Sequence, residues 1–500
     1  MKKNVTNKVI SILTLASILM TSGCGKVTST TSPTAATGVT KLAPYELKVV
    51  YPATGTPVDL PLVQTEMNKQ LTATMNATVV LQPIEWGAWG DKTRLMFASG
   101  EKIDVISSSV NLAYSQNVVK GAYYPIDELL KTSGKDIVSA LGMDYLKGTA
   151  MNGKMYGVPV LKEYGQAYGL VFNKAIVDKY KFDISTIKTY KDLEPMLKII
   201  KENEPGITPL CESLKNICAN FGTQPLFDTL GIDYGGVLPY NSKDFKLISQ
   251  YDFSPYVDSL KWTHDMFLKG YVNKSSLTDQ DEGPMKTGKA FVIPCELKPG
   301  KDAELSIAWG YPVVQTTLFD CVSSATAAEG IMESIGQTSK DPERAMMFIN
   351  ALFNDKKLLN TFVFGVEGKD YVKKSDNIID FPAGIDAKSV GYRNEGWMFG
   401  NQFSDFLFSS ENPKKWDEFK AFNAKAKKSP AIGFAFDSES VKTEIAALDN
   451  VNNKYNAALL TGSVDPAVYL PKLVSDLKAA GWDKVAVEKQ KQLDAWVKTK

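Results

Sequence analysis

This 500-residue chain offers a single imidazole for covalent catalysis. The only histidine is His264, which excludes zinc motifs built on two histidines and leaves a Ser-His-Asp triad one possible imidazole. Leu260 and Phe267 stand four and three residues from it, a spacing typical of the apolar face of a helix. We therefore interpret His264 as a helix residue at the edge of a buried face.

Two glycine-containing segments come close to nucleotide and metal motifs. Residues 283–290, GPMKTGKA, nearly match the phosphate-binding P-loop, but Ala290 occupies the position at which Ser or Thr holds magnesium, and the segment precedes a predicted strand instead of following one. Residues 279–283, DQDEG, resemble the start of a calcium loop, but a glycine replaces the third ligand and comes too early. We expect neither a cofactor nor a bound metal.

Aromatic and polar residues gather instead in loops that follow predicted strands. Trp86 and Trp89 lie beside Gly87 and Gly90 just after one strand. The other candidates for ligand contact are Ser108, Tyr114, Glu163, Tyr164, Trp309, Tyr311, Arg393 and Trp397. Aromatic planes cover apolar ligand faces, and hydroxyl, carboxylate and guanidinium groups bind polar rims, so the pattern is typical of a noncovalent binding site. Core packing is the alternative role, above all for Trp309 and Trp397.

The composition describes a folded chain with no preference for nucleic acid. Apolar residues make up 44% and charged residues 23% of the chain, enough to bury a large core in two or three domains. Lys and Arg number 57 against 56 acidic residues, a formal charge of +1. A near-neutral chain lacks the basic surface that a phosphate backbone requires.

The first residues are typical of an exported, lipid-anchored protein. Three lysines and a short uncharged run from Val9 to Met20 precede Thr21-Ser-Gly-Cys24, and such a run is too short to span a bilayer permanently. The tetrad resembles the bacterial lipobox, with Thr21 where Leu is usual, so we predict cleavage after residue 23 and diacylglyceryl modification of Cys24; an ordinary secretory signal with an incidental Cys is the alternative. A Ser/Thr-rich stretch then predicts a flexible tether to residue 44.

Four further cysteines, Cys211, Cys218, Cys295 and Cys321, remain after that anchor. Outside the cytoplasm they could form two disulfides in three alternative pairings. A chain this long can bury a sufficient core without such links. We favour buried free thiols, with disulfides as the alternative.

From residue 45 strands and helices alternate. The patterns predict strands at 46–51, 78–82 and 103–107, with helices at 58–75 and 91–98 between them. Such alternation predicts an α/β fold with a mostly parallel sheet, whose ligands bind at the carboxyl ends of the strands.

The rest of the chain continues this class and then becomes helical. A hairpin is expected around Asn152-Gly153. Further strands are predicted at 167–173, 289–293 and 305–314, and terminal helices at 441–455, 469–480 and 483–497.

These features together resemble the extracellular solute-binding proteins of ABC importers. Segments of the sugar-binding group are residues 152–159, 288–291 and 341–350, and residues 394–403, 416–423, 429–437, 441–448 and 488–496 are similar to long Gram-positive lipoproteins that end in a helical extension of the DUF3502 type. The resemblance implies a periplasmic-binding-protein type II-like fold, in which two α/β lobes close on a ligand by a hinge motion.

On that resemblance we expect lobe 1 at 45–165 plus about 315–385, lobe 2 at 166–314 plus about 386–437, and the helical extension at 438–500. The implied function is to capture an oligosaccharide or other small solute at the outer face of the cell membrane and deliver it to ABC permease subunits. We expect a monomer that performs no covalent chemistry. A surface glycoside hydrolase is the alternative, because 56 acidic residues could always supply two facing carboxylates.

Overall fold

The computed structural model describes residues 42–151, 153–213, 226–279 and 281–500, and Leu42–Lys500 forms one compact unit. The predicted signal peptide, Cys24, Cys218 and most of the predicted tether lie outside the described residues. Within the described part of the chain, no helix has the length and apolar character that crossing a bilayer requires.

The first sheet contains five strands in the order β2–β1–β3–β13–β6. Their bounds are β1 Tyr45–Ala53, β2 Ala77–Glu85, β3 Val105–Ser108, β6 Gly157–Pro159 and β13 Met332–Ile335. β1 pairs in parallel with β2 and β3, whereas β13 runs antiparallel to β3 and β6. The predicted parallel arrangement of the first three strands is confirmed. We call the part of the chain built on this sheet lobe 1.

Helices cover both faces of the first sheet, so alternate side chains of β1 pack into two different apolar clusters. Leu47, Val49 and Tyr51 pack on one face, and Val50 packs on the other. The covering helices are α1 Leu60–Met75, α2 Trp89–Ser99, α3 Tyr114–Val119, α4 Asp127–Thr132, α5 Lys135–Leu141, α6 Met143–Lys147, α12 Pro342–Asn354 and α13 Lys356–Phe364. The predicted helices at 58–75 and 91–98 are therefore confirmed as α1 and α2.

The second sheet is mixed, with the strand order β17–β12–β7–β11–β8. Its strands are β7 Gln166–Asn173, β8 Thr208–Leu210, β11 Ala290–Leu297, β12 Val313–Ser323 and β17 Lys427–Lys428. The long strands β7, β11 and β12 pair antiparallel. Around this sheet lie α7 Lys174–Tyr180, α8 Glu194–Asn203, α9 Ser254–Leu268, α10 Gly283–Lys286, α11 Lys301–Trp309 and α14 Lys415–Lys425. We call this part lobe 2.

The packing differs from the predicted lobe boundaries in two places. Tyr392, Met398, Phe399, Phe406 and Phe408 belong to the core of lobe 1, although the sequence placed about 386–437 in lobe 2. β12 lies in the second sheet, although residues from about 315 were expected in lobe 1. Both differences arise from pairing and packing between segments far apart in the chain, which local periodicity does not report.

The strand predicted at 305–314 is partly wrong. Residues 301–309 form the helix α11, and the strand β12 begins only at Val313. Gly300 and Gly310 adopt left-handed φ angles of 72° and 76° at the two ends of α11. These glycines permit the turns that bound a short helix. The apolar residues from Leu305 onward resemble those of a strand, which explains the wrong assignment.

Smaller elements complete the fold and agree with several predictions. β4 Ala150–Met151 and β5 Lys154–Met155 form the expected hairpin, and β14 Val372–Lys373, β15 Ile378–Asp380 and β16 Leu407–Phe408 form a small sheet. Cys211 and Cys295 are buried free thiols, as favoured, whereas Cys321 is a free thiol that is only half-buried. His264 lies in α9, where its Nδ1 is 2.7 Å from the Gly462 carbonyl oxygen.

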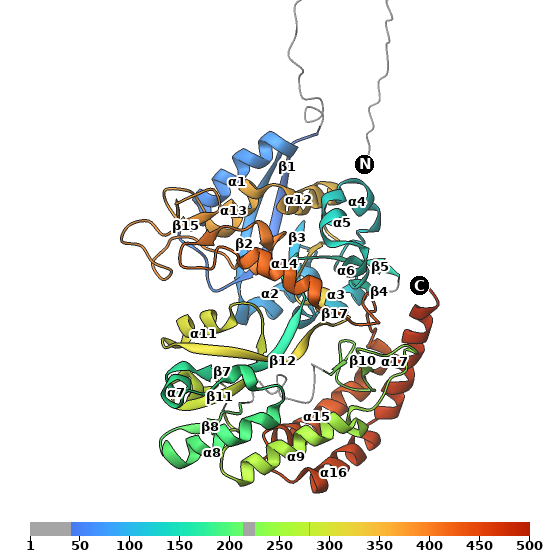
Figure 1. Cartoon of the computed structure of the whole chain (residues 1–500). Coiled ribbons are helices and arrows are strands. Elements are labelled where there is room, and N and C mark those ends of the chain that lie inside the picture. Colours follow the sequence, from blue (N-terminus) through green and yellow to red (C-terminus); the bar gives the residue numbers. More distant parts are fainter. Residues whose placement is uncertain (1–41, 152, 214–225, 280) are drawn as a thin grey trace, which may run out of the picture. The chain divides into compact units, whose positions relative to one another are not determined.

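The chain ends in three helices, as predicted. They are α15 Lys442–Leu460, α16 Pro466–Ala479 and α17 Trp482–Val497 (Figure 1). Their apolar side chains share a core with residues 227–260 of lobe 2, including Tyr234, Tyr256 and Leu260. We call these three helices the C-terminal extension.

Candidate functional site

A cavity of about 900 Å³ lies where the chain crosses between the two sheets. One crossing runs from β6 to β7 through residues 160–165, and another runs from β12 to β13 through residues 324–331. Lobe 1 contributes Asn111 to the wall, lobe 2 contributes Trp309, and both crossing segments contribute residues. Its position and its volume suit a ligand of several rings, because small-molecule sites commonly measure about 300 to 1,000 Å³. We call it the main cavity.

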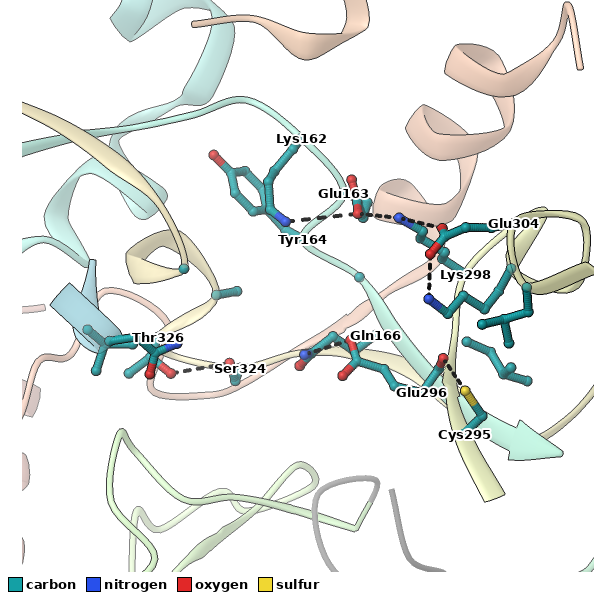
Figure 2. Close-up of a pocket in the computed structure, with 18 of the residues that line it drawn as sticks. Lys162, Glu163, Tyr164, Gln166, Cys295, Glu296, Lys298, Glu304, Ser324 and Thr326 are labelled. Carbon is teal, nitrogen blue, oxygen red and sulfur yellow. Dashed lines mark hydrogen bonds and ion pairs between the residues drawn. The ribbon is translucent and has the colours of Figure 1, made fainter. Parts of the chain in front are cut away.

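A row of alternating charges runs along one wall of the main cavity (Figure 2). Glu163 Oε1 lies 3.1 Å from Lys298 Nζ and 3.9 Å from Lys162 Nζ. Lys298 Nζ also lies 3.4 Å from Glu304 Oε2, and Glu304 Oε1 lies 2.6 Å from Lys301 Nζ. The five charged groups hold one another in place, so the wall presents fixed charges.

The neighbouring lysines keep the two glutamates ionised. Burial raises the pKa of Glu163, but the charges of Lys162 and Lys298 outweigh that effect and hold the pKa below its ordinary value. Burial likewise raises the pKa of Glu304, and Lys298 and Lys301 bring it below the ordinary value. Glu163 Oε2 is buried and has no hydrogen-bond partner among the described residues. A buried acceptor of that kind gains free energy when a donor reaches it.

Aromatic side chains stand beside these charges. Trp309 lines the main cavity and stacks on Tyr311, with ring centroids 6.2 Å apart and planes 24° apart. Tyr164 stacks on Tyr145 at 4.3 Å, and its hydroxyl donates to the Val160 carbonyl oxygen at 2.7 Å. Tyr240 adds a third ring to the wall. Rings fixed in this way offer flat apolar surfaces at little entropic cost.

Asn423 of α14 fixes the crossing segment that carries Glu163. Its Oδ1 accepts from the Tyr164 and Gly165 amides at 2.8 and 3.0 Å, and its Nδ2 donates to the Lys162 carbonyl oxygen at 2.8 Å. One side chain thus satisfies three backbone groups of residues 162–165. This clamp sets the direction in which Glu163 and Tyr164 face the cavity.

A second cavity, of about 700 Å³, lies between α2 and α3. Trp86 and Trp89 line it, and Asn111 lines both this second cavity and the main cavity. The Trp86 ring stacks on Trp397 with centroids 6.4 Å apart and planes 13° apart, and Lys162 Nζ lies 5.8 Å from the centre of the Trp397 ring. The two cavities are therefore neighbours along one edge of lobe 1.

The structure places three of the predicted site residues in the main cavity and two in the second. Glu163, Tyr164 and Trp309 line the main cavity, and Trp86 and Trp89 line the second. Trp397 lines neither cavity, but it supports Trp86.

The other four predicted site residues do not line either cavity. Ser108 is fully buried against Ser334, and Tyr114 is 1% exposed and donates to the Thr149 carbonyl oxygen at 2.5 Å. Ser108 is buried because β3 has neighbouring strands on both sides and helices on both faces. Tyr311 donates to the Met285 carbonyl oxygen, and the Arg393 guanidinium lies 5.1 Å from the centre of the Phe408 ring.

Sequence reasoning missed other residues of the main cavity. The residues that it did not select include Asn111, Asp228, Thr229, Lys298, Glu304 and Thr326. Lys301 and Glu304 stand three residues apart in α11, a helix that was not predicted because a strand was assigned to its second half, from residue 305. Within the described residues, no cluster of His, Cys, Asp and Glu could hold a metal ion.

The two-lobed α/β architecture with a cavity at the crossing segments defines a solute-binding protein. The chain belongs to the family of bacterial extracellular solute-binding proteins, which matches residues 63–317. A domain of unknown function, DUF3502, matches residues 430–498. The predicted family, fold class and terminal extension are thereby confirmed.

Individual relatives agree with this assignment. A carbohydrate ABC transporter substrate-binding protein of Streptococcus pneumoniae is 30% identical over 87% of each chain. The crystal structure of an N-glycan transport solute binding protein (NgtS) from the same species is 28% identical, with a TM-score of 0.80, and the match covers 91% of this chain and 99% of that chain. The lipoprotein LipO of Bacillus subtilis is 21% identical over 76% of this chain and 79% of its own length.

Proposed function

We propose that this protein binds an oligosaccharide in the main cavity and passes it unchanged to the permease of an ABC importer. The observation that carries the proposal is the composition of the cavity wall, to which Trp309 and Tyr240 contribute together with the charged row of Glu163, Lys298 and Glu304. A sugar ring has flat patches of C–H groups and a rim of hydroxyls, which these two kinds of surface match. The names of the S. pneumoniae relatives support a carbohydrate ligand.

The charges on the wall favour a neutral saccharide. Acidic and basic side chains are nearly balanced among the lining residues, which include Asp228, Glu163, Glu282, Glu296 and Glu304 with Lys162, Lys286, Lys298 and Lys301. A charged ligand would leave one sign unpaired in a partly buried site, which costs free energy. Hydroxyl groups can instead donate to carboxylates and accept from ammonium groups without adding charge.

The second cavity extends the proposed site for longer saccharides. Asn111 borders both cavities, and Trp86 keeps 41% of its surface exposed at the edge of the second. An oligosaccharide held by Trp309 could pass Asn111 and place a further ring on Trp86. We therefore include Trp86 and Trp89 in the proposed site, with Trp397 as the support of Trp86.

The electrostatics favour binding over glycoside hydrolysis. A hydrolase needs one carboxylic acid with a raised pKa to protonate the leaving group. Glu163 and Glu304 are ionised because their lysine partners lower both pKa values. Burial raises the pKa of Asp228, but its two oxygens already accept from the Leu230 and Ala325 amides.

The cellular setting follows from the N-terminal sequence and the family. We propose that a diacylglyceryl group on Cys24 holds the protein at the outer face of the membrane, where it works as a monomer beside its permease. The likeness to the lipoprotein LipO and the family's extracellular place support this setting. Two acyl chains suffice for stable anchoring, whereas one does not.

Calorimetry with a panel of neutral and anionic oligosaccharides, peptides and metal ions tests the proposal. We expect micromolar or tighter binding of a neutral oligosaccharide, a gain of about 8 kcal/mol or more. Binding of only peptides or metal ions would contradict it. Fluorescently labelled oligosaccharides distinguish the hydrolase, because a binding protein returns them intact and a hydrolase releases shorter products.

A further inference from the structure

The C-terminal extension contains one lysine that is fully buried. Lys489 of α17 has no exposed surface, and Val485 and Leu493, four residues away on either side, are also fully buried. A buried ammonium group is costly unless polar partners surround it. Its partners therefore show what α17 stabilises.

Those partners are backbone carbonyl oxygens of a single loop. Lys489 Nζ lies 2.7 Å from the carbonyl oxygen of Thr229, 3.0 Å from that of Ile232, 3.1 Å from that of Tyr234 and 2.8 Å from that of Gly236. We call residues 229–236 the cradle loop. An ammonium group has only three hydrogens, so one side chain engages all its donors in this loop.

The backbone of the cradle loop is strained and closely packed on α17. Leu230 is buried with a left-handed φ of 53°, which costs an L-residue free energy unless its surroundings fix it. A Cβ at Gly235 would lie 2.9 Å from backbone atoms of Val485 and Ala486 in α17. The loop therefore keeps this conformation because α17 is beside it.

The cradle loop leads directly into the wall of the main cavity. Thr229, whose carbonyl oxygen contacts Lys489, lines that cavity together with Phe227 and Asp228. Asp228 Oδ1 accepts from the Leu230 amide at 2.8 Å, and its Oδ2 accepts from the Ala325 amide at 2.7 Å. These bonds join the loop to the crossing segment 324–331, which also lines the cavity.

Apolar packing follows the same route. Leu493, one turn after Lys489, shares a buried cluster with Leu230 of the cradle loop and Ala325 of the crossing segment. The extension therefore contacts the cavity wall and a connection between the lobes through one helix face. We propose that Lys489 positions the wall of the saccharide site, so that the C-terminal extension sets ligand affinity from outside the cavity. This inference rests on the proposed function and assigns a role to the domain of unknown function.

Lys489→Met and Lys489→Ala test the proposal in the full-length protein. The control is Lys491→Met, because Lys491 lies on the same helix and pairs only with the neighbouring Glu488 on the surface. Affinity is measured by calorimetry with the neutral oligosaccharide that the wild type binds, and folding is checked by circular dichroism and thermal melting. We expect at least tenfold weaker binding for both Lys489 variants and unchanged binding for Lys491→Met.

Added propylammonium separates positioning from general stability. In Lys489→Ala it can occupy the space left by the lysine and donate to the same carbonyl oxygens, so we expect it to restore at least part of the affinity. It should have no effect on the wild type or on Lys489→Met. Wild-type affinity in a folded Lys489→Met protein would overturn the proposal.

Hydrogen exchange of the wild type covers the case in which the Lys489 variants do not fold. Saccharide binding should slow exchange of the amides of residues 228–236, and of α17 around Lys489. Unchanged exchange at those amides, while the ligand is bound, would overturn the proposal. A wild type that binds no saccharide would instead contradict the proposed function and this inference with it.

Discussion

Replacing Trp86 by alanine should weaken the binding of long oligosaccharides about tenfold. Trp86 keeps 41% of its surface exposed beside the second cavity, and Trp397 supports it from behind. A tryptophan buries at most about 250 Å², so about 100 Å² remains available. If a sugar ring covers half of that area, about 1.2 kcal/mol is gained at 25 cal/mol per Å². This free energy corresponds to nearly a tenfold change in the dissociation constant.

The length of the ligand makes the assay specific. A short saccharide that fills only the main cavity should bind Trp86→Ala and wild type alike, whereas a longer saccharide should lose its additional affinity in the variant. Trp86→Phe should lose less, because a smaller ring still stacks. Leu95→Ala is the matched control, because Leu95 lies on α2 and is 65% exposed, and it lines neither cavity.

Two outcomes would refute the reasoning. Equal affinity of Trp86→Ala and wild type for every saccharide would remove the second cavity from the site. Equal losses for short and long saccharides would show that Trp86 acts on the main cavity instead. In that case Trp86 would act through Trp397, on which it stacks. Lys162 lines the main cavity, and its Nζ lies 5.8 Å from the centre of the Trp397 ring, so Trp397 would transmit the effect to Lys162.

Four further predictions concern the same molecule. Trp309→Ala should weaken the binding of short and long saccharides alike by about tenfold in calorimetry, because the Trp309 ring lines the main cavity. A loss of affinity for long saccharides alone would contradict this. Glu163→Gln should weaken binding and lower the melting temperature by a few degrees, because it removes a charge from beside the half-buried Lys298; unchanged affinity and melting temperature would exclude the charged row from the site. Burial raises the pKa of Glu333 to about 8, so its contribution to stability is present below pH 4 and is lost as the pH rises through 8; calorimetric melts should show a falling melting temperature from pH 5 to 8.5 and a smaller fall in Glu333→Gln. Cys24→Ala should move the protein from the membrane fraction to the medium, and its retention would show that the anchor was misread.

Local patterns predicted the three parallel strands of the first sheet because these strands obey simple rules. β1, β2 and β3 are separated by helices of ordinary length and carry apolar side chains on both faces, so periodicity identifies each one. The same patterns failed at α11, where a short apolar run between Gly300 and Gly310 resembles a strand. The length of an apolar run distinguishes a helix from a strand only when the run is longer than an ordinary strand.

The cavity was harder to predict because its partners are distant in the chain. Glu163 and Lys298 form an ion pair although they are 135 residues apart in the sequence. Trp86 likewise stacks on Trp397, which is far from it in the sequence. The sequence identified Glu163, Tyr164 and Trp309 by their chemical type. It had no means to pair them with Lys298 or to place Ser108 in the interior, because those facts depend on the register and the cover of the sheets.

The helical periodicity of α17 indicates that Lys489 lies on its apolar face. Trp482, Val485, Leu493 and Trp496 repeat at helical spacing on α17, and Lys489 stands in the middle of that apolar face. A lysine can extend its charge to solvent from the edge of such a face, but at its centre it must find acceptors inside the protein. A polar group must therefore face Lys489 where this helix packs against the rest of the protein. Only the fold reveals that this group is the backbone of the cradle loop, which leads into the wall of the main cavity and so connects the extension to the proposed site.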